Sequence, residues 1–369
     1  MNVSPPSTLP PRPRARQAGV ATGILPPGAC DAITDVGGVL VGHATVSEGD
    51  DVRTGVTVVL PHAGNVFQEK VAAAAFVANG FGKLVGITQL DELGVLETPI
   101  ALTGTLNVWR VADALAEWVL ALPGNEGVLS VNPVVGECND GHLSDIHRRP
   151  VGREHLLAAI ASAAPGPVAE GCVGAGTGCC CLGWKGGIGT ASRKLPAALG
   201  SWTVGVLAQA NFNFGGVLTV ANAPVGVELG RHAFRDELAR PEGGSCMVVV
   251  ATDAPVDARQ LKRVAARVPM GLARVGSFAS NGSGDYAIAF STDPSCRVRH
   301  EAPGLRQVAL LPDEDLSQLF LATVEATEEA VLNSLFAAVT TRGFQGHLVE
   351  ALPIDRVLAI LRRHGALAS

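Results

Sequence analysis

The chain has 369 residues, of which 47 % are hydrophobic and 17 % charged, and it contains 44 glycines. This composition is typical of a globular protein with ample apolar material for a buried core. The formal net charge of −6, together with the lack of any long run of Lys and Arg, argues against a nucleic-acid-binding surface.

Residues 1–18 are rich in Pro, Ser and Arg and lack the apolar segment of a secretory signal, so we expect a disordered leader there. No later stretch has ~18 consecutive apolar residues, which predicts no membrane span. Eight cysteines without a secretory signal indicate reduced thiols and a cytoplasmic protein. The consecutive Cys179, Cys180 and Cys181 would alternate in direction on a strand, so we expect buried core residues and no metal site.

The hydrophobic pattern predicts alternating strands and helices along the whole chain. In the first half we expect, in order, short strands within 31–61, a helix at 66–79 ended by glycines, a helix at 103–122 and a strand at 128–135. The second half is predicted to contain a helix at 154–163, a glycine-rich stretch at 171–190, strands at 202–210, 246–251 and 286–291, and helices at 257–268, 314–341 and 353–364. This spread favours one layered α/β domain over residues 19–369.

Ser245 follows Gly243-Gly244 and precedes a wholly apolar strand. Cleavage of a backbone before Ser needs an unusual conformation at the preceding residue, which Gly adopts at low cost. A freed Ser245 would carry both a hydroxyl group and an α-amine with a pKa of ~7.7–8.0, the arrangement of an N-terminal nucleophile. The alternative is an ordinary turn before a strand.

Three further segments carry polar side chains next to predicted strands. Ser283 and Asp285 lie in a glycine-bounded loop before the strand at 286–291, where they could orient a nucleophile's proton or simply form a hairpin turn. Asn211 ends the strand at 202–210, and a side-chain amide there can stabilise an oxyanion. Glu137 follows the strand at 128–135 and could bind an ammonium group; the alternative is a polar loop.

The glycine runs at 174–178 and 185–190 suggest a phosphate-binding loop, but neither contains the complete GxxxxGK[ST] pattern. Tight turns and close approach of backbones are the favoured explanation of these runs. A glycine-rich protein that binds an anionic ligand without turnover is therefore the alternative from a different functional class.

Taken together and in order, the motifs resemble the DmpA/BapA family of self-processing serine aminopeptidases, which includes L-aminopeptidase/D-esterases and β-peptidyl aminopeptidases. The resemblance extends from about residue 20 to the C-terminus. It rests on ITDVGGVLVGHATV, RTGVTVVLP, KVAAAAFVANGFGK, ELGVLETPIALTGTLNVWRVADAL, NPVVGECNDGHLSDI, VGAGTG, KGGIGTASR, VGVLAQANF, GGS and NGSGDYAIAFST.

The resemblance implies a cut between Gly244 and Ser245, which gives an α chain of residues 1–244 and a β chain of residues 245–369. It implies Ser245 as nucleophile, Ser283 and Asp285 as the pair that assists it, and Asn211 in the oxyanion hole. Glu137 would hold the free N-terminus of the substrate.

The implied fold is a four-layer αββα sandwich similar to that of N-terminal nucleophile hydrolases, with different connectivity. The implied substrate is a small peptide, amide or ester with a free amino terminus. The resemblance further implies a homo-oligomer, often a tetramer, that needs no metal and no organic cofactor. It leaves the choice between α- and β-amino acids, and between L- and D-substrates, open.

This sequence departs from the family pattern at several positions. Cys246 follows the nucleophile and should point away from the cleft by strand alternation, with a thiol nucleophile as the alternative. The stretch after Asn211 is long, which makes Asn213 an alternative amide donor. Tyr286 is the only tyrosine, so no phenol is available in the 137–145 loop and Asn139 is the candidate there for contact with the substrate.

A second enzymatic alternative is a self-cleaving acyltransferase of the ornithine acetyltransferase kind. Those enzymes use a threonine after the cut, and the serine here together with the motif series argues against that reading.

Overall fold

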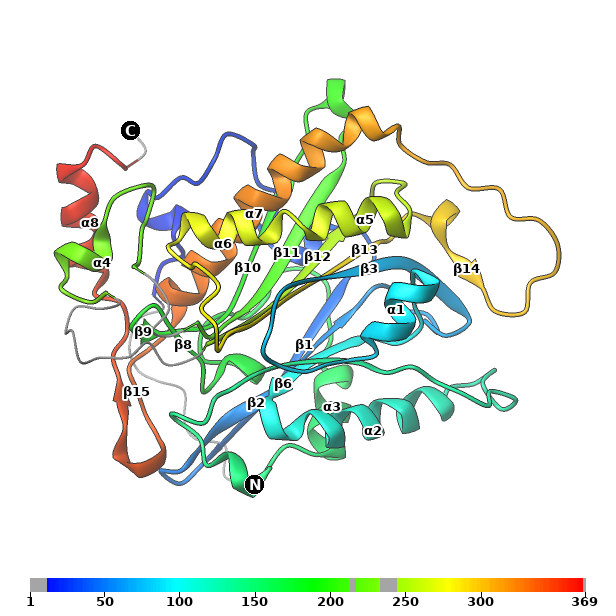
Figure 1. Cartoon of the computed structure of the whole chain (residues 1–369), viewed down its shortest axis with the longest axis horizontal. Helices are drawn as coiled ribbons and strands as arrows, with labels where there is room; N and C mark the ends of the chain where they lie inside the picture. Colours follow the sequence, from blue (N-terminus) through cyan, green and yellow to red (C-terminus); the bar gives the residue numbers. More distant parts are fainter. Residues whose placement is uncertain (1–11, 213–216, 233–243, 368–369) are drawn as a thin grey trace.

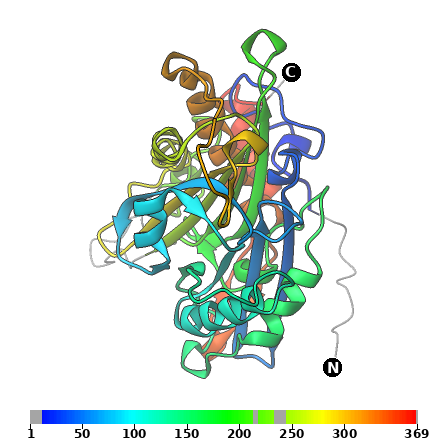
Figure 2. The ribbon, with the colours of Figure 1, turned by 90° about the vertical axis from the view of Figure 1, so that its right-hand side faces the viewer.

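The computed structural model describes residues 12–212, 217–232 and 244–367. Two β-sheets lie face to face, and helices cover the outer face of each sheet (Figure 1, Figure 2). Three apolar clusters fill the three spaces between these layers. The layer order is therefore helix, sheet, sheet, helix, which confirms the expected αββα sandwich.

The first sheet has the strand order β1-β2-β6-β7-β4. Its strands are β1 (Leu40–Glu48), β2 (Val52–Leu60), β6 (Ile100–Gly104), β7 (Val134–Cys138) and β4 (Leu84–Val85). Only β6 and β7 run parallel. Helices α2 (Val108–Leu120) and α3 (Arg153–Ala161) cover its outer face through an apolar side that includes Val111, Leu115 and Leu156.

The second sheet has the order β10-β11-β12-β13-β3-β14, with β5 paired to β3. Its strands are β10 (Gly187–Lys194), β11 (Thr203–Ala210), β12 (Ser245–Thr252), β13 (Gly284–Ser291), β3 (Glu69–Gly80), β14 (Val298–Arg299) and β5 (Val95–Leu96). Strands β12 and β13 run parallel to each other. Helices α5 (Ala258–Ala265), α6 (Val268–Arg274) and α7 (Leu316–Ala337) cover the outer face.

Short elements surround these layers. They are α1 (Ile87–Leu93), β8 (Cys180–Cys181), β9 (Trp184–Lys185), α4 (Val225–Glu228), β15 (Thr341–Arg342), β16 (Leu348–Val349) and α8 (Ile354–Arg363). Within the described ranges, no helix combines the length and apolar character needed to cross a membrane.

The helix predicted at 66–79 is wrong, because this segment forms strand β3. Its alanine-rich stretch is buried on both sides: Ala72 and Ala74 face the helices, while Ala73 and Ala75 face the other sheet. Small side chains on both faces let α5 pack closely on the strand, and this tertiary packing outweighs the helical preference of alanine.

Two other boundaries differ from those expected. The strand predicted at 128–135 begins only at Val134, because Pro133 cannot donate to a strand ladder. The helix predicted at 257–268 ends at Ala265, and a separate helix, α6, follows with Pro269 in its first turn. The remaining predicted helices and the strands at 202–210, 246–251 and 286–291 lie where expected, within a few residues.

The disordered leader predicted for residues 1–18 is wrong for residues 12–18, and residues 1–11 lie outside the described part of the chain. Ala15 is fully buried, and its N–H donates to Asn333 Oδ1 at 3.0 Å. Arg14 donates to Glu170 at 2.7 Å and to the Thr190 carbonyl at 2.7 Å. The contacts of Ala15 and Arg14 with buried partners outweigh the polar composition that predicted disorder.

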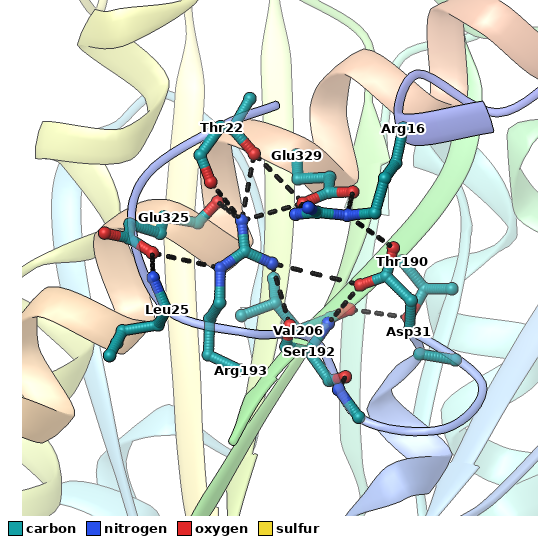
Figure 3. A network of polar contacts seen from close by, with 12 residues as sticks. Arg16, Thr22, Leu25, Asp31, Thr190, Ser192, Arg193, Val206, Glu325 and Glu329 are labelled. Carbon is teal, nitrogen blue, oxygen red and sulfur yellow. Dashed lines mark hydrogen bonds and ion pairs between the residues drawn. The ribbon is translucent and has the colours of Figure 1, made fainter. Parts of the chain in front are cut away.

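Arg193 of β10 is the centre of a buried ionic network beneath the N-terminal segment (Figure 3). Its guanidinium group donates to Glu325 at 3.1 Å and to Glu329 at 2.7 Å, both on α7. The same group donates to the carbonyl and hydroxyl oxygens of Thr22, at 2.7 and 2.9 Å. Arg16 adds a second bond of 2.6 Å to Glu329. The network therefore joins the N-terminal segment, the second sheet and α7.

Replacing Arg193 with Met should lower the free energy of unfolding by about 3–5 kcal/mol, because Glu325 and Glu329 would then lack their central buried cation. Urea unfolding followed by circular dichroism measures this loss. The matched control is Arg148→Met, which removes an exposed pair with Glu48 and should cost under about 1 kcal/mol. Equal effects of the two substitutions would contradict the role given to Arg193.

Candidate active site

Ser245 is the first residue of β12, and its side chain is held by two donors. The backbone N–H of Asn139 donates to Ser245 Oγ at 3.1 Å, and Asn211 Nδ2 donates to the same oxygen at 3.3 Å. Ser245 is only 3 % exposed. Two N–H donors therefore converge beside the serine oxygen, in the region where the oxygen of an attacked carbonyl group would gain negative charge.

The pairing of β12 explains why these groups meet. The N–H of Asn211 donates to the Ser245 carbonyl at 3.1 Å, and the Ser245 N–H donates back to the Asn211 carbonyl at 3.3 Å. This antiparallel pair places the end of β11 beside the start of β12. On the other side, the parallel strand β13 brings Gly284 opposite Ser245. The end of β11 and the starts of β12 and β13 therefore lie side by side at one end of the sheet.

Asn211 has its side-chain amide held at both ends. Its Oδ1 accepts from the Cys180 N–H at 2.8 Å, and its Nδ2 donates to the Asn139 carbonyl at 2.8 Å as well as to Ser245. These partners set the amide so that its NH₂ group faces the serine. Asn213, the alternative donor, lies outside the described residues.

Lys185 supports the segment that holds Asn211. The side chain is fully buried, and its Nζ donates to the carbonyls of Gly176, Cys179 and Gly186 at 3.2, 2.7 and 2.8 Å. The glycine-rich stretch at 171–190 therefore uses its lysine internally. A phosphate-binding loop would instead need that cation to face a ligand.

Ser283 and Asp285 form a pair of their own: Ser283 Oγ donates to Asp285 Oδ1 at 2.9 Å. Ser283 ends the loop before β13 and Asp285 is the second residue of β13, so the two flank Gly284, whose N–H donates to the Gly244 carbonyl at 3.1 Å. By strand alternation their side chains point to the opposite face from that of Ser245. In this uncut chain the pair thus lies beside the Gly244–Ser245 peptide bond, and among the described contacts neither side chain bonds to Ser245 Oγ.

Burial raises the pKa of Asp285 to about 6, and the hydrogen bond from Ser283 opposes this rise. Asp285 Oδ2 is buried, with no hydrogen-bond partner among the described residues. An acid that titrates close to neutral pH can take up or release a proton during a reaction.

Glu137 is buried at the wall of the same site, 3 % exposed. Its Oε1 accepts from the Lys83 N–H at 3.1 Å and from Lys83 Nζ at 3.2 Å. Its Oε2 is buried and has no hydrogen-bond partner within the described ranges. The second carboxylate oxygen is therefore available for a cationic group of a ligand.

A cavity of about 730 Å³ connects these side chains. It brings together four of the residues predicted from the sequence, namely Ser245, Asn211, Glu137 and Asn139, along with Gly244. Ser283 and Asp285 are buried behind it, next to Gly282, which lines the wall. The other lining residues are Gly80, Phe81, Gly82, Lys83, Thr105, Gly141, His142, Ile146, Cys180 and His347.

The sequence did not indicate His142 and His347. Their rings stack at 4.3 Å, and His347 Nδ1 bonds to the His142 carbonyl at 2.8 Å. His347 comes from the turn between β15 and β16, about two hundred residues along the chain, and it lies in no recognisable motif. The 80–83 loop lines the cavity, and Trp184 packs in the core beside Arg231.

Cys246 is fully buried on the face of β12 that packs against the helices. Burial raises its pKa well above the usual value of a thiol. The prediction that it points away from the cleft is confirmed, and the geometry opposes a thiol nucleophile. Within the described ranges no group of three or more His, Cys, Asp or Glu side chains could hold a metal ion.

Comparison with known proteins agrees with this geometry. The model of peptidase family S58 matches residues 31–349. A β-peptidyl aminopeptidase, BapA of Sphingosinicella microcystinivorans, is 42 % identical over 97 % of this chain and 94 % of its own.

Solved structures of two similar proteins also match. A β-aminopeptidase of a Burkholderia species has a TM-score of 0.87 and 41 % identity, covering 95 % of this chain and 99 % of its own. The L-aminopeptidase D-Ala-esterase/amidase of Ochrobactrum anthropi has a TM-score of 0.89 and 36 % identity, covering 97 % of this chain and all of its own. It is described as a prototype of the serine aminopeptidases and a variant of the Ntn hydrolase fold. The expected family is confirmed: the chain belongs to peptidase family S58 and is an aminopeptidase, a peptide-bond hydrolase of the N-terminal nucleophile type.

Proposed function

We propose that this aminopeptidase cuts itself between Gly244 and Ser245 and then uses Ser245 as its nucleophile. The observation that carries the proposal is the pair of donors, the Asn139 N–H and Asn211 Nδ2, on Ser245 Oγ. The products of the cut would be an α chain of residues 1–244 and a β chain of residues 245–369, together forming one catalytic domain.

In the cleavage step, Ser245 Oγ attacks the carbonyl carbon of Gly244 and the bond to the Ser245 nitrogen breaks. The resulting ester is hydrolysed by water, which leaves a carboxylate on Gly244 and a free amine on Ser245. Negative charge develops on the Gly244 oxygen during the attack. The Gly284 N–H already donates to that oxygen at 3.1 Å and would stabilise the negative charge, which supports the proposed self-cleavage.

In the aminopeptidase reaction, Ser245 Oγ attacks the first carbonyl of the substrate. The new α-amine, with an ordinary pKa of ~7.7–8.0, accepts the hydroxyl proton and passes it to the leaving group. Asn211 Nδ2 and the Asn139 N–H stabilise the oxyanion. Water then releases the acyl group from Ser245. Ser283 and Asp285 flank Gly284, whose N–H bonds to the Gly244 carbonyl at the proposed cut, and we propose that they assist proton transfer at the new amine.

Glu137 binds the free ammonium group of the substrate through Oε2, the buried oxygen without a described partner. This contact selects small peptides, amides or esters with a free amino terminus. Because two of the similar proteins are β-aminopeptidases, we propose that substrates with an N-terminal β-amino acid are accepted. Turnover of p-nitroanilides of matched α- and β-amino acids, in L- and D-forms, tests this choice.

We also propose a cytoplasmic homotetramer, as the family resemblance implies. Light scattering of the purified protein measures the assembly, and a monomer would contradict it. Neither alternative function is favoured: Lys185 is occupied by backbone carbonyls, and the residue after the proposed cut is serine instead of threonine.

Ser245→Ala should remain a single chain without peptidase activity, whereas the wild type should give two chains. The reason is that alanine lacks the oxygen that attacks Gly244. Denaturing gels and intact mass measure the chains, and the wild-type β chain should begin at Ser245. A wild type that stays uncut and is fully active would refute the proposal.

Asn211→Asp should lower kcat by roughly 10²–10³-fold, because the variant keeps the Oδ1 acceptor for Cys180 but loses the NH₂ donor to the oxyanion. The measurement is steady-state turnover of an aminoacyl p-nitroanilide, corrected for the fraction of cut chain. An unchanged kcat in fully cut protein would exclude Asn211 from the oxyanion hole.

A further inference from the structure

Asp140 is a buried acid next to the active site that the reaction above does not use. It directly follows Asn139, whose N–H donates to Ser245 Oγ and whose carbonyl accepts from Asn211. Asp140 is 1 % exposed, and neither carboxyl oxygen has a hydrogen-bond partner of normal geometry among the described residues. Burying a polar group without a hydrogen-bond partner lowers the stability of the fold, so such a group at an active site suggests a functional role.

The side chain of Asp140 fills a slot made by two glycines. A Cβ on Gly104, at the end of β6, would lie 2.6 Å from Asp140 Oδ2 and 2.9 Å from Thr54 Oγ1. A Cβ on Gly178 would lie 2.8 Å from the Asp140 Cβ. The slot therefore accepts the carboxyl group only because both neighbours lack side chains.

The same residue also shapes the loop through its backbone. The Asp140 carbonyl accepts from the N–H groups of Leu143 and Ser144, at 3.1 and 3.0 Å. Asp140 thus closes a tight turn directly after Asn139, with its side chain seated against β6. Asp140 is thus joined directly to the residue whose N–H donates to Ser245 Oγ.

We propose that Asp140 is a positioning residue that holds the Asn139 N–H in place for the proposed reaction at Ser245, and that it does so only as the neutral carboxylic acid. Apart from the residue's own backbone N–H, the slot offers an ionised carboxylate no N–H donor within the described ranges, so ionisation favours withdrawal of the side chain from the slot. The inference rests on the proposed function, because it assigns the Asn139 N–H a role in catalysis.

The charges around Asp140 agree with a protonated state near neutral pH. Burial raises its pKa to about 7. The Thr54 hydroxyl and the residue's own backbone N–H oppose this rise, Glu137 adds to it and the cation of Lys185 opposes it. The thiol of Cys180 also faces Asp140, and burial raises the pKa of that thiol to about 12, so it carries no charge near neutral pH. The neutral acid therefore dominates below about pH 7 and is lost above it.

The test compares the pH dependence of kcat in Asp140→Asn and wild type on one substrate. The amide has the shape of the neutral acid and does not ionise. The ratio of kcat, variant to wild type, should be near one at low pH and should rise as the pH passes about 7. Other ionising groups affect both enzymes and cancel in the ratio. A ratio that stays constant over the whole range would overturn the proposal.

Two further variants complete the experiment. Asp51→Asn, an exposed position near the same loop, should give a flat ratio near one. Thr54→Val removes the hydroxyl that lowers the Asp140 pKa, so its ratio to wild type should also rise with pH. If Asp140→Asn does not fold, Thr54→Val decides the question: an unchanged profile would refute the pH-dependent role.

Failure of the inference differs from failure of the proposed function. If the proposed function is wrong, the wild type stays a single chain or hydrolyses no amide. If only the inference is wrong, the wild type is cut and active while the ratios stay flat.

Discussion

The backbone ladder around β12 is the constraint on which the active site depends. β12 pairs with β11 on one side and with β13 on the other, so residues from three distant segments meet at the edge of the sheet. The reciprocal hydrogen bonds between Ser245 and Asn211 set the distance between the proposed nucleophile and its proposed amide donor. A slip of one residue in this register would turn Ser245 toward the helices.

Buried charges serve two different purposes in this chain. Around Arg193, Glu325 is held by the guanidinium group and two backbone N–H groups, and Glu329 by arginine and the Thr22 hydroxyl, as a structural network requires. Near Ser245, in contrast, Glu137, Asp140 and Asp285 each retain at least one buried oxygen without a described partner. Such unpaired acids are destabilising, and their concentration around Ser245 is the electrostatic signature of a functional site.

The sequence predicted the strands β11, β12 and β13 because their apolar runs are bounded by glycine and polar residues. It failed for β3, where a run of alanines has no strand pattern and only packing between two layers determines the conformation. It also failed for residues 12–18, whose arginines find buried partners that no local pattern reveals.

For the site, the individual motifs at Ser245, Asn211 and Glu137 were ambiguous, and only the family resemblance connected them. The sequence alone could not predict that these residues and Asn139 line one cavity, because they come from separate segments that only the tertiary structure brings together. His347, Lys185 and Asp140 were beyond sequence reasoning, because their roles depend on contacts with segments far along the chain or on a slot between two glycines.

The central claim, that Ser245 acts as an N-terminal nucleophile, is tested most directly by trapping the acyl-enzyme. The purified protein is mixed with a slowly hydrolysed aminoacyl ester, quenched in acid and analysed by peptide mass spectrometry. We predict an acyl group on the hydroxyl oxygen of Ser245, within a peptide that begins at that residue. An acyl group on another side chain, or on a chain that is still intact across Gly244 and Ser245, would contradict the account.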